Sequence, residues 1–224
     1  MHATWKQSFS LYCQPQVLIM GLFGFSSGLP LLLVFSTLSF WLREADIERA
    51  SIGFFSWVAL AYAFKWAWSP LVDQIKLPLL CQHLGRRKSW LLFTQIMIVS
   101  MLLIMATQDP QQGLVLFIIA ALGLAFFSAT QDIVIDAFRI ESADTQFQGA
   151  MTATYMTGYR LAMIIAGAGS LAIAALYDGS DNYNANAWQF SYACMALLMG
   201  LGILATLFAK EPESSTQVAK VTSF

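Results

Sequence analysis

The chain has 224 residues, of which 58% are hydrophobic and 11% are charged, and its formal net charge is −1. Soluble domains carry about 25% charged residues, so this composition excludes an ordinary soluble domain and indicates an integral membrane protein. The net charge says nothing about nucleic acid, but the sequence has no basic patch large enough to follow a phosphate backbone, so we expect no nucleic-acid partner.

A spanning helix needs about 20 mostly apolar residues. Six stretches meet this requirement and predict an all-α, polytopic membrane protein with spans at about 17–41, 51–71, 89–107, 113–138, 149–177 and 188–209. We therefore expect three parts: an N-terminal segment 1–16, a six-helix bundle 17–209 and a polar tail 210–224. The first stretch is too long for a signal peptide and lacks a small-residue cleavage site, so it reads as a span.

The first span carries two packing signals. Gly24 and Gly28 form a GxxxG face that permits close contact with another helix, and Pro30 is expected to kink the span. Aromatic residues near the predicted span ends indicate anchors at the membrane surface: Trp5, Trp41, Tyr177 and Trp188.

Basic residues are unevenly divided between the two sides of the predicted bundle. One side holds Lys6, Lys76, Arg86, Arg87, Lys88, Arg139, Lys210 and Lys220. The other side holds Arg43 and Arg49. Since cytoplasmic loops carry the excess of Lys and Arg, we expect both termini in the cytoplasm.

Four ionisable residues lie inside predicted spans: Lys65, Asp132, Asp136 and Arg160. Each mid-span charge costs about 2.5–3.5 kcal/mol on insertion scales. Asp132 and Asp136 are four residues apart on one helix face, next to Gln131, and must meet water, protein or the opposite charges of Lys65 and Arg160. Structural ion pairs are one interpretation, and a polar pathway lined by titratable groups is the one we favour.

The joint between the second and third spans carries a second charge pattern. "WSPLVDQ" (68–74) ends in Asp73, and "LGRRKSW" (84–90) contains Gly85, Arg86 and Arg87. The basic triplet alone could be only a topology signal, but an acidic residue followed by Gly-Arg-Arg is more specific.

This joint resembles the cytoplasmic loop signature of the major facilitator superfamily, although Ser69-Pro70 replace its glycine and the segment between Asp73 and Gly85 is longer. Five further strings resemble AmpG-type muropeptide permeases: "GFSSGLPLLL" (24–33), "IGFFSWVALAYAFKWAWSPLVD" (52–73), "GRRKSWLL" (85–92), "SATQDIVIDAFRIE" (128–141) and "TGYRLAMIIAGAGSLAIA" (157–174). The resemblance covers about residues 15–212.

The resemblance implies proton-driven import of anhydromuropeptides across the bacterial inner membrane. It implies that Asp132, with Lys65, serves proton coupling and solute contact, that Asp136 lines the same cavity, and that Arg160 meets an anionic solute. Further solute contacts are implied for Gln131, Tyr62 and Tyr159 at sugar hydroxyls and for Trp57 at a sugar face. Asp73, Gly85, Arg86 and Arg87 would form a cytoplasmic gate.

Permeases of this type consist of two six-helix halves, and this chain matches the first. We therefore expect a second half, as a separate chain or a second copy, and the lipid bilayer, protons and a small solute as further partners. The alternatives are a carrier of another anionic solute, such as acetyl-CoA or a sugar, and a truncated remnant that does not transport. We expect no enzyme, metal or cofactor, because Ser/His/Asp and HExxH patterns are absent and the three cysteines and two histidines do not form a zinc set.

Overall fold

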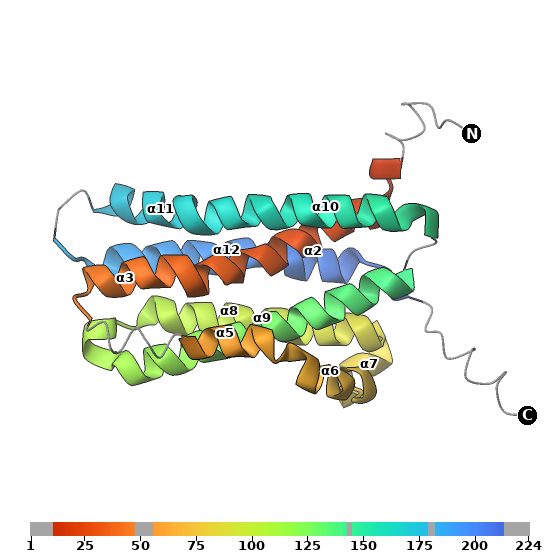
Figure 1. Ribbon diagram of the computed structural model, residues 1–224, viewed down its shortest axis with the longest axis horizontal. Coiled ribbons are helices and arrows are strands. Elements are labelled where there is room, and N and C mark those ends of the chain that lie inside the picture. Colours follow the sequence, from red (N-terminus) through yellow and green to blue (C-terminus); the bar gives the residue numbers. More distant parts are fainter. Residues whose placement is uncertain (1–10, 48–55, 143–144, 179–181, 213–224) are drawn as a thin grey trace, which may run out of the picture.

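The computed structural model describes residues 11–47, 56–142, 145–178 and 182–212, and the regular structure within these ranges is helical (Figure 1). Five helical segments of the described chain are long and apolar enough to cross a membrane: Pro15–Glu44, Arg86–Thr107, Pro110–Ser142, Phe147–Tyr177 and Ala185–Phe208. They fall on five of the six predicted spans. The all-α, multi-pass membrane bundle is thereby confirmed.

The second predicted span differs from the others because it is interrupted. Its described part consists of α5 (Ser56–Ala63) and α6 (Lys65–Gln74), separated at Phe64, where φ is −95° and ψ is 6°. The start of this predicted span, residues 51–55, lies outside the described residues. Lys65 is thus the first residue of a new helix inside a stretch that is otherwise apolar, and α7 (Pro78–Leu84) follows at the end of the bundle.

Two spans contain π-helical turns that face each other. The first span runs through α2 (Pro15–Leu32), η1 (Leu33–Thr37) and α3 (Leu38–Glu44). The fifth runs through α10 (Thr145–Ile164), η3 (Ile165–Gly169) and α11 (Ser170–Tyr177). The Thr37 hydroxyl donates to the Ala166 carbonyl at 2.8 Å, so a side chain of one turn binds a backbone carbonyl of the other.

The remaining spans are α8 (Arg86–Thr107), α9 (Pro110–Ser142) and α12 (Ala185–Phe208). Helix α2 packs mainly on α10, while α8 packs on both α9 and α12. In Figure 1 the start of α2, the end of α9 and the end of α12 lie at the same end of the bundle as α7. We call this the basic end, after Arg86, Arg87, Lys88 and Arg139, and the other the opposite end.

The close approach of α2 and α10 depends on glycine. A Cβ atom at Gly24 or Gly28 would overlap the backbone of Tyr155 or Tyr159, and one at Gly158 would overlap Gly21. The predicted GxxxG contact is therefore confirmed, with α10 as its partner. Its consequence for the site is that Ser27, between the two α2 glycines, lies against Tyr155.

The expected anchoring role of two tryptophans is wrong. Trp41 and Trp188 are 0% and 2% exposed, and their rings stack with centroids 5.8 Å apart in the core at the opposite end. Their polar N–H groups are satisfied internally, since Trp41 donates to the Tyr183 hydroxyl and Trp188 to Glu44. Tyr177 is 53% exposed, as an anchor requires, and Trp5 lies outside the described residues.

Candidate functional site

Asp132 lies in the middle of a hydrogen-bonded group contributed by α2, α9 and α10. Its side chain is 13% exposed and accepts a hydrogen bond from the Ser27 hydroxyl of α2. The Ser27 oxygen also lies 2.9 Å from the Tyr155 hydroxyl of α10. The carboxylate is therefore bound directly by Ser27, which is itself hydrogen-bonded to Tyr155, and an intramembrane charge requires polar partners of this kind.

Lys65 provides the opposite charge that Asp132 needs. Its Nζ lies 3.9 Å from Asp132 Oδ2, and its side chain is 37% exposed. The helix break at Phe64 starts α6 at this residue, which brings the ammonium group toward α9. The Tyr62 ring, one turn earlier, packs on Phe35 with centroids 5.6 Å apart and lies within electrostatic range of Asp132.

Asp136 does not join this group, although it shares a helix face with Asp132 by spacing. Its side chain is 53% exposed and pairs with Arg139 at 3.4 Å, three residues along the same helix. Arg139 Nη1 also donates to the Thr152 hydroxyl on α10. The two aspartates therefore occupy different surroundings, one between helices and one near the basic end.

The other predicted solute contacts differ in exposure: some lie at the surface of the bundle and one is buried between helices. Arg160 is exposed on α10, without an ion pair to a described residue, and Tyr159 is partly buried beside Tyr155 with ring centroids 6.0 Å apart. Trp57 on α5 is 62% exposed. Gln131 is instead fully buried and donates from Nε2 to the Ser26 hydroxyl at 3.3 Å, so it links α9 to α2.

The predicted gate residues meet at the basic end around one guanidinium group. Arg87 is 6% exposed at its side chain, and its Nη1 lies 2.6 Å from Asp73 Oδ1. Its Nη2 and Nε donate to the two oxygens of Glu141 at 2.5 and 3.1 Å, which is a bidentate contact. Arg86 donates to the Asp73 carbonyl at 2.8 Å. The end of α6, the start of α8 and the end of α9 are thereby connected.

Glu211 completes this network from the far end of the described chain. Its carboxylate oxygens accept hydrogen bonds from the backbone N–H groups of Arg87 at 2.8 Å and Lys88 at 3.0 Å. A carboxylate at these free N–H groups caps the start of α8 and complements its dipole. Gly85, with φ of 85°, lets the chain turn directly before this cap, and a Cβ atom there would meet Glu211.

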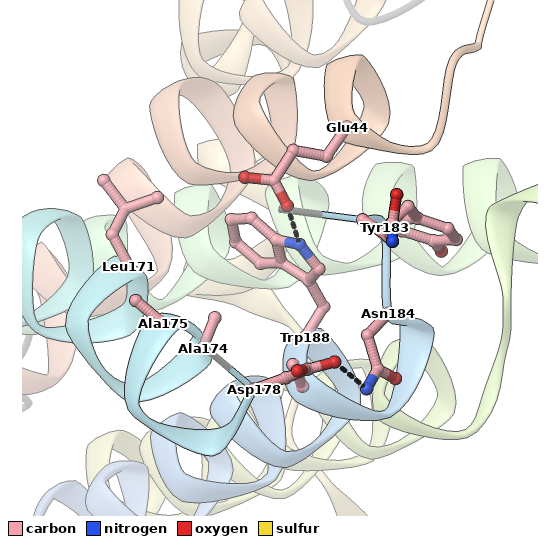
Figure 2. Close-up of a pocket in the computed structure, with 10 residues that line it drawn as sticks. Glu44, Leu171, Ala174, Ala175, Asp178, Tyr183, Asn184 and Trp188 are labelled. Atoms are coloured by element: carbon pink, nitrogen blue, oxygen red, sulfur yellow. Dashed lines mark hydrogen bonds between the residues drawn. The ribbon is translucent and has the colours of Figure 1, made fainter. Parts of the chain in front are cut away.

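A separate cavity of about 490 Å³ lies at the opposite end (Figure 2). In Figure 2, Leu171, Ala174 and Ala175 lie on its left, Glu44 lies above and Asp178 lies below, with Trp188 between the two acids. Its polar groups are already engaged, because Trp188 Nε1 donates to Glu44 at 2.6 Å and Asn184 donates to Asp178. None of the predicted site residues lines it.

Four residues that complete the two networks were not singled out from the sequence. Ser27 and Tyr155 complete the Asp132 group, and Glu141 and Glu211 complete the basic end. A signal was available for Ser27, because it lies between the two glycines of the close helix contact. Glu141 and Glu211 are ordinary-looking acidic residues after predicted spans, and only the folded arrangement identifies their partners.

Comparisons with known proteins show that this chain is similar to membrane transporters. Residues 16–115 match the family model described as Acetyl-coenzyme A transporter 1. The Anhydromuropeptide permease of Escherichia coli strain K12 is 38% identical over 215 residues, which is 96% of this chain and 41% of the relative. A Rickettsia felis protein that carries the name AmpG 4 is 36% identical over 89% of this chain and 46% of its own length.

These alignments confirm the resemblance inferred from the sequence strings. The chain spans less than half of the length of these relatives. An uncharacterized Haemophilus influenzae protein is likewise covered over less than half of its length. It is 37% identical over 90% of this chain and 45% of the relative.

Proposed function

From its homology to AmpG-type permeases over most of its length, we propose that this chain forms one six-helix half of a proton-coupled importer. The proposed solutes are anhydromuropeptides, and the proposed location is the bacterial inner membrane. The observation that carries the proposal is the Lys65–Asp132 pair at 3.9 Å, which sits beside hydroxyl groups of α2 and α10. Intramembrane ionisable groups of this kind mark proton and solute pathways.

In this proposal the solute contacts Arg160 and Tyr159 on α10 and Trp57 on α5, which are exposed or partly exposed. Arg160 carries a permanent positive charge in a planar fork, which suits a carboxylate of the solute. Tyr159 and Trp57 offer a hydroxyl and an exposed aromatic face for a sugar ring. Gln131 is buried and links α9 to α2 through Ser26. Tyr62 packs on Phe35.

A second six-helix half is the proposed partner of this chain. Two spans present wide apolar faces that the bundle leaves uncovered, and α10 with α11 is only 22% buried in its most apolar window. The exposed residues on these faces include Trp57, Leu60, Phe64, Trp66, Met156, Leu161 and Ile164. Lys65 and Arg160 lie among them, so a second bundle there would enclose the charges in a central cavity, as transporters built from two repeats do.

The basic end is proposed to face the cytoplasm, with both termini on that side. The support is the excess of Lys and Arg at this end. The Asp73, Arg87 and Glu141 network would then close the cytoplasmic side of the transporter, with Gly85 and Arg86 positioning its residues.

Uptake of labelled N-acetylglucosaminyl-anhydromuramic acid by permease-lacking bacteria tests this proposal. The cells express the chain alone, or together with the remaining segment of a full-length relative, and membrane insertion is checked by immunoblot. Uptake that a protonophore abolishes supports the proposal. An inserted, complemented chain that gives no uptake contradicts it. Unlabelled acetyl-CoA is the matched competitor, because residues 16–115 match the acetyl-coenzyme A transporter model, and inhibition by it alone would favour that solute.

A further inference from the structure

Three oxygen atoms form a continuous chain from Asp132 of α9 through Ser27 of α2 to Tyr155 of α10. The Ser27 hydroxyl donates to Asp132 Oδ1, and the Tyr155 hydroxyl oxygen lies 2.9 Å from Ser27 Oγ. A serine hydroxyl has only one hydrogen to donate. Since that hydrogen goes to the carboxylate, the Tyr155 hydroxyl must donate to Ser27. With Asp132 ionised, both hydroxyl hydrogens therefore point inward.

The surroundings of Asp132 decide where an added proton would reside. Oδ2 faces the Lys65 ammonium at 3.9 Å, and an ammonium group has only donors, so an O–H placed there would oppose it. Oδ1 faces the Ser27 oxygen, which can accept. The proton is therefore better placed on Oδ1, with the neutral carboxyl donating to Ser27.

Protonation at Oδ1 changes what Ser27 and Tyr155 can do. Ser27 now accepts from Asp132, and its own hydrogen turns to the Tyr155 oxygen. The Tyr155 hydrogen, no longer needed by Ser27, turns outward. Tyr155 is partly exposed on α10, one turn before Tyr159 and five residues before Arg160.

We infer that Ser27 and Tyr155 form, with Asp132, a hydrogen-bond chain whose direction reverses when Asp132 takes up a proton, freeing the Tyr155 hydroxyl hydrogen for an acceptor oxygen of the solute. The inference rests on the proposed transport function and assigns it a coupling device. Only a proton is added and no covalent bond other than O–H changes. One neutral hydrogen bond gained in this way strengthens solute binding about three- to tenfold.

Several other titratable groups lie within electrostatic range of Asp132. They are Lys65 on α6, Tyr62 on α5, Asp136 on the same helix, and Tyr155 and Tyr159 on α10. The α2 segment that faces Asp132 contributes Ser27 and no charged side chain. Tyr159 is the useful comparison. It also interacts electrostatically with Asp132, but it has no hydrogen bond to Ser27 among those of the described residues.

Infrared difference spectra of the purified chain in lipid nanodiscs, recorded between two pH values with ring-labelled tyrosine, test this inference without any solute. The carboxyl band that disappears in Asp132→Asn should grow on acidification together with a change in a tyrosine C–O band. Tyr155→Phe and Ser27→Ala should remove the tyrosine change. Ser27→Thr, which keeps the hydroxyl, and Tyr159→Phe should retain it.

The inference is overturned if Ser27→Ala keeps the tyrosine change, since a merely structural serine would leave it in place. It is equally overturned if the wild-type carboxyl band appears without any tyrosine change, or if no Asp132 band appears. Circular dichroism shows whether the Ser27→Ala protein is folded. If it is not, the wild-type and Tyr155→Phe spectra test the inference instead. Failure of uptake would count against the proposed solute and leave these spectra unaffected.

Discussion

The Lys65 ammonium and the Asp132 carboxylate face each other at 3.9 Å across the contact between α6 and α9. Lys65 begins a helix after the break at Phe64, whereas Asp132 lies within the uninterrupted part of α9. The pair therefore joins the interrupted span to a continuous stretch of helix. A change in the charge of Asp132 alters the attraction that holds α6 in place.

Replacing Lys65 by glutamine should slow proton-driven uptake about fivefold, because a partly exposed ion pair contributes about 1 kcal/mol. Lys65→Arg should keep most of the rate, since it retains the charge. Initial uptake rates at equal membrane content measure the effect. Lys76→Gln, at an exposed position outside the spans, is the matched control, and an equal loss in it would contradict the explanation.

Gly24→Ala should lower the melting temperature of the bundle, because the added methyl group overlaps the backbone of Tyr155. Overpacking of this kind costs about 1–3 kcal/mol. Gly200→Ala provides the control, since a Cβ atom there meets nothing within 4 Å and alanine is the better helix former. Thermal unfolding in detergent compares the two, and equal melting temperatures would argue against the close α2–α10 contact.

Arg87→Ala should destabilise the chain by about 1.5–3 kcal/mol, because it removes the charge-assisted hydrogen bonds to the largely buried Glu141, which retains Arg86 at 3.4 Å. Arg87→Lys should rescue only part of this loss, since one ammonium cannot reproduce the two-pronged contact. Asp73→Asn should cost less than Glu141→Gln, because the Asp73 side chain is 47% exposed and that of Glu141 is 17% exposed. The order of the four melting temperatures is the measurement, and the reverse order for the two acids would refute it.

Arg160→Gln should raise the KM for an anionic muropeptide about tenfold or more, because a charge-assisted hydrogen bond contributes about 1.5–3 kcal/mol. The KM of Arg160→Lys should lie between those of the wild-type protein and Arg160→Gln, because lysine keeps the positive charge but lacks the planar pair of donors. The same solute with its carboxylate esterified supplies the control. A KM for the ester that also rises tenfold would show that Arg160 acts on the helix and not on the solute charge.

The sequence predicted the bundle well because membrane spans are set by length and hydropathy, which are local properties. It also predicted a partner for Asp132, since a charge inside the membrane needs one and Lys65 was among the few available. It did not predict the break at Phe64, where no glycine or proline marks the interruption. The side-by-side burial of Trp41 and Trp188 was missed for a related reason, because a tryptophan near a span end can face lipid or the neighbouring span, and only packing decides.

The placement of Asp136 shows where spacing alone is insufficient. Four residues from Asp132 on one helix, it shares a face with it, but that face passes from the helix contact to the open surface near the basic end. Arg139, three residues further on, then becomes its nearest cation. Neighbouring helices, which a single sequence does not place, decide which part of a polar face is enclosed.

The Asp132→Asn chain, complemented by the remaining segment of a full-length relative, tests the central claim most directly. Asparagine keeps the size and can accept from Ser27 but cannot take up a proton. The account predicts that this protein inserts normally yet no longer accumulates the labelled disaccharide in response to a proton gradient. Accumulation at the unmodified rate, with unchanged dependence on pH, would contradict it.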